Sequence, residues 1–119
     1  MHHPTIVHLS SISEAKKAIE DIGSDPLSIP IMAPKMVLRI VKMDNVVLQD
    51  AIIMKQDMLS IGGEVAVPKE TFELYTKTAS ILISGTVHQL KMLVHKLKRH
   101  YPRIQKIAME LDMIIEEIV

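Results

Sequence analysis

Apolar residues recur at helical spacing in four stretches of the chain, so one face of each stretch is apolar and amphipathic helices are predicted. These stretches are residues 12–22, 48–61, 87–100 and 102–118. Shorter apolar runs between them predict β-strands. These runs are residues 6–9, 36–41, 64–67 and 79–84. In the last run, residues 81–83 are all apolar, which predicts a strand buried on both faces.

Capping residues mark the start of two of these helices. Ser11 with Glu14, and Thr86 with Gln89, fit the capping box, in which two side chains bond free amides of the first turn. Gly23 follows the first helix and is placed to end it in a left-handed conformation. These signals support both helices independently of their apolar faces.

Proline and turn residues predict the connections. Residues 24–35 hold three prolines, which favours an extended connector. Asp44 and Asn45 predict a turn that ends the second strand, and one of them is expected to cap the helix that follows. Residues 69–78 alternate like a strand but also fit a helical turn, so both interpretations stay open. Pro102 is suited to the first position of the last helix.

Strands that alternate with helices imply crossover connections and at least partly parallel pairing. We therefore predict an α/β fold, in which a small mixed sheet of about four strands has helices packed on it. A C-terminal helix at 102–118 completes the fold. The length of 119 residues suits one domain, assigned to residues 1–119.

The composition narrows the function classes. Fourteen basic residues balance fourteen acidic ones, which argues against broad binding to nucleic acid. The chain has no cysteine, so thiolate chemistry is excluded and a cytoplasmic location is expected. The N-terminus lacks the pattern of a secretory signal, and no uncharged apolar run is long enough to cross a membrane. We expect no bound metal, since His88 and His95 are two helical turns apart and too distant to share one ion. We also expect no cofactor.

Lys55 interrupts the apolar face of the helix at 48–61. That face is formed by Leu48, Ala51, Ile52, Met58 and Leu59. A desolvated lysine can pair with a buried carboxylate, bind an anion or act as a base with a lowered pKa. Alternatively, its stem lies along the edge of the face and its amine reaches water. Asp57 or Glu64 is then a candidate to neutralise it.

Glycines stand near Lys55 along the chain. Gly62 and Gly63 follow its helix, where they can admit a ligand to the backbone or simply end the helix and turn the chain. Gly85 and Thr86 lie between a strand and a helix, a position that can bind anions. For Thr86 we favour capping alone.

Eight basic side chains are concentrated between positions 91 and 106. They are Lys91, His95, Lys96, Lys98, Arg99, His100, Arg103 and Lys106. Such a stretch fits a phosphate or nucleic-acid surface. We favour a solvated face, because cations are stabilised near a helix C-terminus and Tyr101 is the only aromatic residue among them.

Three segments together resemble the N-terminal extension that precedes the pterin-binding barrel in some dihydropteroate synthases and archaeal dihydropteroate synthase-like proteins. They are residues 31–35 (IMAPK), 51–68 (AIIMKQDMLSIGGEVAVP) and 81–86 (ILISGT), with Gln89 and Leu90 behind the last. The middle segment is the specific one, and the family pattern places a Lys-Gln pair at Lys55 and Gln56. The barrel itself needs about 250 residues, so the resemblance implies the accessory role of the extension and no synthase activity.

We therefore expect a free-standing, noncatalytic binding or assembly domain. It is expected to associate with itself, most simply as a dimer, or with a barrel protein of pterin or folate-type metabolism. The expected contact is the apolar stripe of the last helix, formed by Ile104, Ile107, Leu111, Ile115 and Ile118. The alternative is a small-molecule site, possibly enzymatic, for an anionic or pterin-like ligand. Its candidate residues are Lys35, Lys55, Gln56, Gly62, Gly63, Glu64, Gly85 and Thr86.

Overall fold

The computed structural model describes residues 1–69 and 77–119, which form five α-helices, a short 3₁₀ helix and three β-strands. In chain order these are α1 (Ile12–Ile22), α2 (Ile29–Met32), η1 (Ala33–Lys35), β1 (Leu38–Val47), α3 (Leu48–Ile61), β2 (Glu64–Ala66), β3 (Thr78–Thr86), α4 (Val87–Leu97) and α5 (Pro102–Ile118). The predicted α/β class is confirmed. The expected strand at 6–9 is wrong, because that segment pairs with no strand of the described residues and Ile6 is 85% exposed. The ambiguous stretch 69–78 falls mostly outside the described residues.

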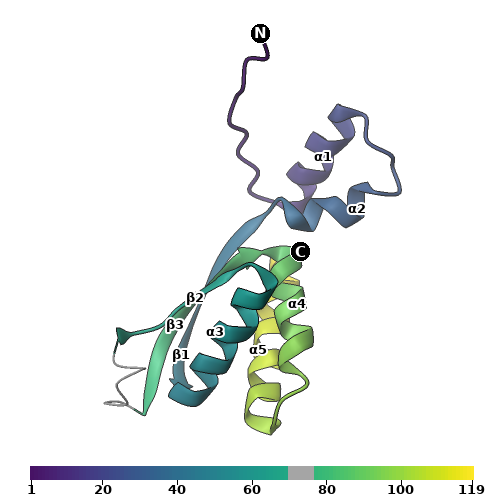
Figure 1. The fold of residues 1–119 in the computed structure, drawn as a ribbon. Helices are drawn as coiled ribbons and strands as arrows, with labels where there is room; N and C mark the ends of the chain where they lie inside the picture. The colour runs from purple at the N-terminus through teal and green to yellow at the C-terminus, as the bar shows by residue number, and fades with distance from the viewer. Residues whose placement is uncertain (70–76) are drawn as a thin grey trace.

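The three strands form one sheet in the order β1-β3-β2, and both pairings are antiparallel. The prediction of partly parallel pairing is therefore wrong for the described residues. Since β1 and β2 both run opposite to β3, they run in the same direction as each other. The segment β1-α3-β2 is a split β-α-β unit, with β3 inserted between its two parallel strands (Figure 1).

The longer helices α3, α4 and α5 lie on one side of the sheet (Figure 1). Val41, Ile83 and Val65 stand side by side across the three strands and are buried beneath these helices. Leu82 points to the other face and is 44% exposed. The expectation that 79–84 is buried on both faces is therefore wrong. Alternation along β3 buries one face and leaves the other open.

Strand β1 is longer than the pattern predicted, because Asp44 and Asn45 do not end it. They form an irregularity inside the strand, where the register against β3 shifts between Met43 and Val46. Asn45 adopts a φ of 57°, a left-handed conformation that asparagine tolerates better than most residues. Helix α3 consequently starts after Val47, which has no side chain able to cap it.

Local signals at helix ends are largely confirmed. The hydroxyl of Ser11 accepts from the Glu14 amide at 3.0 Å, although the Glu14 carboxylate bonds Ser10 rather than Ser11. Thr86 and Gln89 form the complete capping box of α4. Gly23 ends α1 in the expected left-handed conformation, with a φ of 88°.

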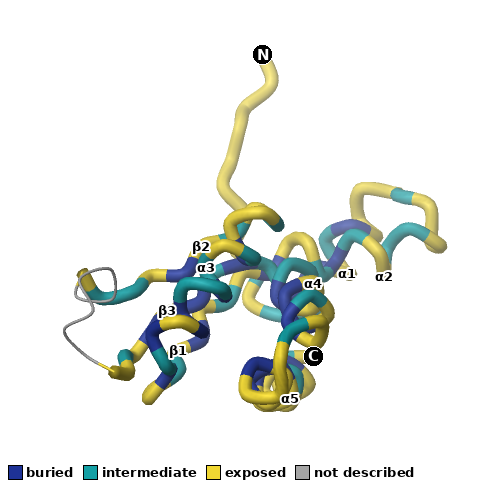
Figure 2. Tube along the Cα trace, turned by 60° about the horizontal axis from the view of Figure 1, so that its bottom comes forward, coloured by how far each residue is buried: buried dark blue, intermediate teal, exposed yellow. Residues whose placement is uncertain are grey.

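The connector at 24–35 is not extended. It contains α2 and η1, each with a proline in its first turn, where the missing amide hydrogen costs no helical bond. These two short helices hold α1 at one end of the sheet (Figure 1). The first ten residues lead away from this end and are largely exposed (Figure 2).

The apolar stripe of α5 packs within the chain. Ile104, Ile107, Leu111 and Ile115 are at most 8% exposed and belong to the same core as α3 and the sheet. Ile118 packs against the margin of that core. These side chains are already covered inside one chain, so a self-association surface has to use other residues. No helix in the described part of the chain is long and apolar enough to cross a membrane.

Candidate functional site

Lys55 forms a tie between α3 and the edge of the sheet. Its amine donates to the Glu64 carboxylate at 2.8 Å and to the backbone carbonyl of Val65 at 2.7 Å. The Lys55 side chain is 27% exposed and that of Glu64 is 56% exposed, so water still reaches the pair. Hydrogen bonds from Lys55 and from the Val65 amide hold the pKa of Glu64 below its ordinary value. The cation in the apolar face is thus already paired.

The glycines beside Lys55 serve close packing around Met58. A Cβ at Gly63 would lie 2.5 Å from the Met58 methyl and 2.8 Å from the Ser84 carbonyl oxygen. A Cβ at Gly85 would lie 2.5 Å from the same methyl. Met58 is completely buried. It occupies the space that the small-molecule hypothesis assigned to a ligand.

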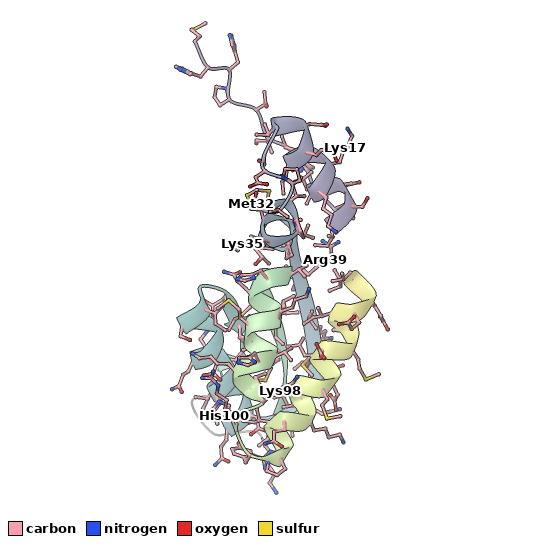
Figure 3. All side chains as sticks on the ribbon, turned by 90° about the vertical axis from the view of Figure 1, so that its right-hand side faces the viewer. Lys17, Met32, Lys35, Arg39, Lys98 and His100 are labelled. Atoms are coloured by element: carbon pink, nitrogen blue, oxygen red, sulfur yellow. The ribbon has the colours of Figure 1, made fainter. Side chains whose placement is uncertain are left out.

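The other predicted ligand residues do not converge on that point. Gly62 ends α3 with a φ of 104°, and Thr86 caps α4. Gln56 is exposed on α3. Lys35 is exposed at the end of η1, beyond the N-terminal end of α4 (Figure 3). Among the described residues no hydrogen bond or ion pair joins Lys35 or Gln56 to Lys55.

The fully buried charge of the described residues is Asp50, in the first turn of α3. Arg103 donates two hydrogen bonds to its carboxylate, from Nε at 2.6 Å and from Nη2 at 2.9 Å. The Tyr101 hydroxyl donates to the same carboxylate, and the Arg103 guanidinium lies 5.1 Å from the centre of the Tyr101 ring. Both partners stand at the start of α5. The cluster therefore ties the beginning of α3 to the α4–α5 turn.

These contacts keep Asp50 ionised despite its burial. Burial pushes the pKa of Asp50 up, but the bonds from Arg103 and Tyr101 outweigh it and leave the pKa below its ordinary value. The hydrogen bond between the Tyr101 hydroxyl and Asp50 also raises the pKa of the Tyr101 phenol. Bidentate pairing with guanidinium is among the strongest arrangements open to a carboxylate. Because both carboxylate oxygens accept hydrogen bonds from within the chain, we read this cluster as a lock of the fold.

The sequence pattern missed this cluster. An aspartate in the first turn of a helix is expected there on dipole grounds alone. The only available signal was that Asp50 and Asp57 are seven residues apart, which places both on one face of α3. The structure uses this spacing, since Asp57 meets His100 at 2.9 Å. Both carboxylates thus engage the segment that joins α4 to α5.

The basic stretch is consequently divided in two. His100 and Arg103 are held by carboxylates of α3. Lys91, Lys96 and Arg99 have no carboxylate partner within ion-pair distance among the described residues. These three side chains line a hollow of about 480 Å³ between the outer face of α4 and the end of α3. Its other lining residues are Ser60, Ile61, His88, Met92 and His95.

Metal ligation receives no support from the described side chains, because no three His, Asp or Glu residues among them gather at one point. Comparison of the chain with protein-family models, with curated proteins and with solved structures found no match. The functional argument therefore rests on the geometry of the chain itself.

Proposed function

We propose that the chain is a binding and assembly domain that pairs with a second copy of itself through the open face of its sheet. The observation that carries this proposal is the row of aliphatic side chains on that face. Leu38 is 57% exposed, Ile40 is 60% exposed and Leu82 is 44% exposed. No helix or strand of the described residues lies over them (Figure 1). An uncovered aliphatic face of this kind is typical of a contact surface.

The charges on this face favour a second copy as the occupant. The Lys42 amine and an Asp44 carboxylate oxygen on β1 lie 3.8 Å apart and balance each other. Glu64, which stands opposite Ser84, is balanced by Lys55. Ser80 and Ser84 of β3 are uncharged. In a two-fold pair each surface meets its own copy, so a face with excess charge would repel itself. A nearly neutral face on a chain with zero net charge avoids that repulsion.

The size of the face sets the expected affinity. Strands β1 and β3 are about 30 Å long and β2 is about 10 Å long, so at a spacing of about 4.8 Å the face covers roughly 350 Å² on each copy. The total of roughly 700 Å² lies below the 1,200–2,000 Å² of stable complexes. We therefore expect a weak dimer with a dissociation constant on the order of micromolar or above.

Sedimentation velocity over a range of concentrations tests the proposal. Ile40→Lys places a charge on the open face without touching the core, and we expect it to abolish the dimer at every concentration. Met113→Lys is the matched control, since Met113 is 72% exposed but lies on α5. It should leave the dimer intact. A monomer at millimolar concentration, or a dimer lost only in Met113→Lys, would contradict the proposal.

The resemblance to the synthase extension supplies the competing occupant, a pterin-binding barrel protein. Native mass spectrometry of the chain mixed with such a barrel distinguishes the two. A heterocomplex that Ile40→Lys disrupts, formed by a chain that is otherwise monomeric, would replace the second copy by that partner. The small-molecule alternative at Lys55 is not favoured, because Glu64 pairs the lysine and Met58 fills the space.

A further inference from the structure

The hollow beside α4 has the size and construction of a small-molecule site. Its volume of about 480 Å³ falls within the range typical of ligand pockets. All of its lining residues except Arg99 stand on α3 or α4, and Arg99 lies in the turn directly after α4. The carbonyl of Asp57 accepts from the Ser60 hydroxyl at 2.6 Å, and Ser60 in turn accepts a bond from Lys96. One cation is thereby positioned at the rim.

The three cations of this hollow line the same space, whereas several cations elsewhere on the described surface are each paired with a carboxylate. Lys17, Lys42 and Lys55 each pair with a carboxylate, and so does Arg103. The hollow gathers three permanent cations and two histidines, and none of its lining residues is acidic. Positive charge is thus concentrated where the lining residues and the ion pairs of the described residues supply no compensating carboxylate, and an anionic ligand would supply one.

The helix dipole does not account for this distribution. Cations near the end of α4, such as Lys96, are stabilised by the last carbonyl groups. Lys91, however, stands in the second turn, where the dipole gives a cation no such support. Helix α4 has no acidic residue at all. Basic side chains are thus not confined to the end of the helix, which favours a ligand over local helix stabilisation.

The hollow also offers an apolar surface. Ile61 at the end of α3 and Met92 in the middle of α4 line it between the cations, and Met92 is 44% exposed. A ligand that carries both phosphate and an uncharged body would meet both kinds of lining. The lining contains no Phe, Tyr or Trp, so the large aromatic rings on which single-stranded nucleic acids mainly stack are missing from it.

We propose that this hollow binds a small phosphorylated molecule, whose phosphate groups lie among Lys91, Lys96 and Arg99 and whose uncharged part rests on Ile61 and Met92. This site is separate from the open face of the sheet. Its occupancy and the self-association of the chain are therefore independent properties. Nucleic acid is the other polyanion to consider, and the neutral net charge of the chain argues against it.

Titration of the full chain with ATP and with inorganic tripolyphosphate, followed by amide NMR and calorimetry, tests this proposal. We expect saturable one-site binding of both probes, with shifts confined to α4 and the end of α3. ATP should bind more tightly than tripolyphosphate, because only ATP has an uncharged body to place on Ile61 and Met92. Failure of both probes to saturate below about 10 mM, an affinity of about 3 kcal/mol, would overturn the proposal.

Charge-removing variants separate a site from general attraction. Lys91→Gln together with Arg99→Gln should weaken ATP about tenfold for each cation removed. Lys98→Gln is the matched control, since Lys98 follows α4 but does not line the hollow (Figure 3). It should change the affinity less than about twofold. All three side chains are exposed, so thermal unfolding should be unchanged in every variant.

Three outcomes would overturn the proposal in this second experiment. An equal loss in Lys98→Gln would show attraction to the whole basic surface rather than a site. Tighter binding of a single-stranded oligonucleotide than of ATP, with a steep dependence on salt, would assign the surface to nucleic acid. Retention of ATP affinity in the double variant would also exclude the hollow.

Discussion

Two charged side chains of helix α3 meet opposite environments, although they are five residues apart. Asp50 is completely buried, and Arg103 and Tyr101 supply three hydrogen bonds to its carboxylate. Lys55 is 27% exposed and pairs with Glu64, a carboxylate that is itself mostly in water. Both charges are paired, but only the Asp50 carboxylate is shielded from solvent, whereas the Glu64 carboxylate is not. Exposure, rather than the presence of a partner, separates the two regions.

This difference determines what each pair contributes. An ion pair that water reaches is screened and contributes about 0–1 kcal/mol. A charge without access to water depends entirely on its partners, and removing one of them costs about 3–5 kcal/mol. A charged residue within an apolar helical face, such as Lys55, is therefore not necessarily the buried one. In this chain the buried charge occupies an inconspicuous first-turn position.

The largest effect is expected for Arg103→Ala. It leaves the Asp50 carboxylate buried with Tyr101 alone, and we expect the free energy of unfolding to fall by about 3–5 kcal/mol. Urea unfolding followed by circular dichroism measures this change. Lys106→Ala, at an exposed position of the same helix without an ion pair among the described residues, should cost less than about 0.5 kcal/mol. Equal losses in the two variants would remove the distinction between the regions.

A smaller loss is expected from filling the space beside Met58. In Gly63→Ala the new methyl meets the backbone oxygen of Ser84 as well as the Met58 side chain. We expect a cost of about 1–3 kcal/mol, as for other overpacked sites. In Gly85→Ala the contacts are all with side chains, which can move, so the cost should be lower. If Gly63→Ala is neutral, the space near Lys55 is open and the ligand hypothesis regains support.

Acid titration sharpens the same comparison. The folded-state pKa of Asp50 lies below its ordinary value, so its stabilisation is fully present above the unfolded pKa of about 3.9. It is lost as the pH falls through the folded pKa. Asp50→Asn lacks this titration, and its stability should fall less steeply, by up to about 1.4 kcal/mol per pH unit. Glu14 and Glu64, which also have lowered pKa values, remain in both proteins and cancel. Parallel curves between pH 5 and 3 would contradict the proposed lock.

The sequence predicted those features that depend on neighbouring residues. The Thr86–Gln89 box, the stops at Gly23 and Gly62, and the start of α5 at Pro102 each involve contacts within one turn. Such signals survive whatever the rest of the fold does, because the groups that they satisfy lie in the same helix end. The apolar face of α5 was also predicted correctly, because its spacing is a property of that segment alone. The surface that it packs against was not predicted, since an apolar stripe looks the same whether it packs within one chain or against a second chain.

Features that depend on distant residues were missed. The insertion of β3 between β1 and β2 turned an expected parallel pair into two antiparallel ones, and no local pattern encodes that choice. Asp50 bonds Tyr101 and Arg103, which are 51 and 53 residues away in the chain. Asp44 and Asn45 show the converse, because their turn propensity was real but was absorbed as an irregularity within β1. Pairing of β1 with β3, both before Asp44 and after Asn45, outweighed that turn propensity.

The smallest effect is expected for Lys55→Met, which removes the more exposed pair. Methionine continues the apolar face of α3, so lost pairing and gained apolar contact oppose each other. We expect the free energy of unfolding to stay within about 1 kcal/mol of the unmodified chain. Urea unfolding measures it against Glu64→Gln, which should give a similarly small change.

A second measurement on Lys55→Met reports the contact itself. The hydrogen bond from Lys55 is the largest cause of the lowered pKa of Glu64, so this pKa should rise toward its ordinary value in the variant. Carboxyl NMR titration follows it residue by residue. A small stability change with a raised Glu64 pKa identifies a solvent-screened tie between α3 and β2. A loss above about 3 kcal/mol would instead place the lysine in the same class as Asp50, as a charge that the fold must shield.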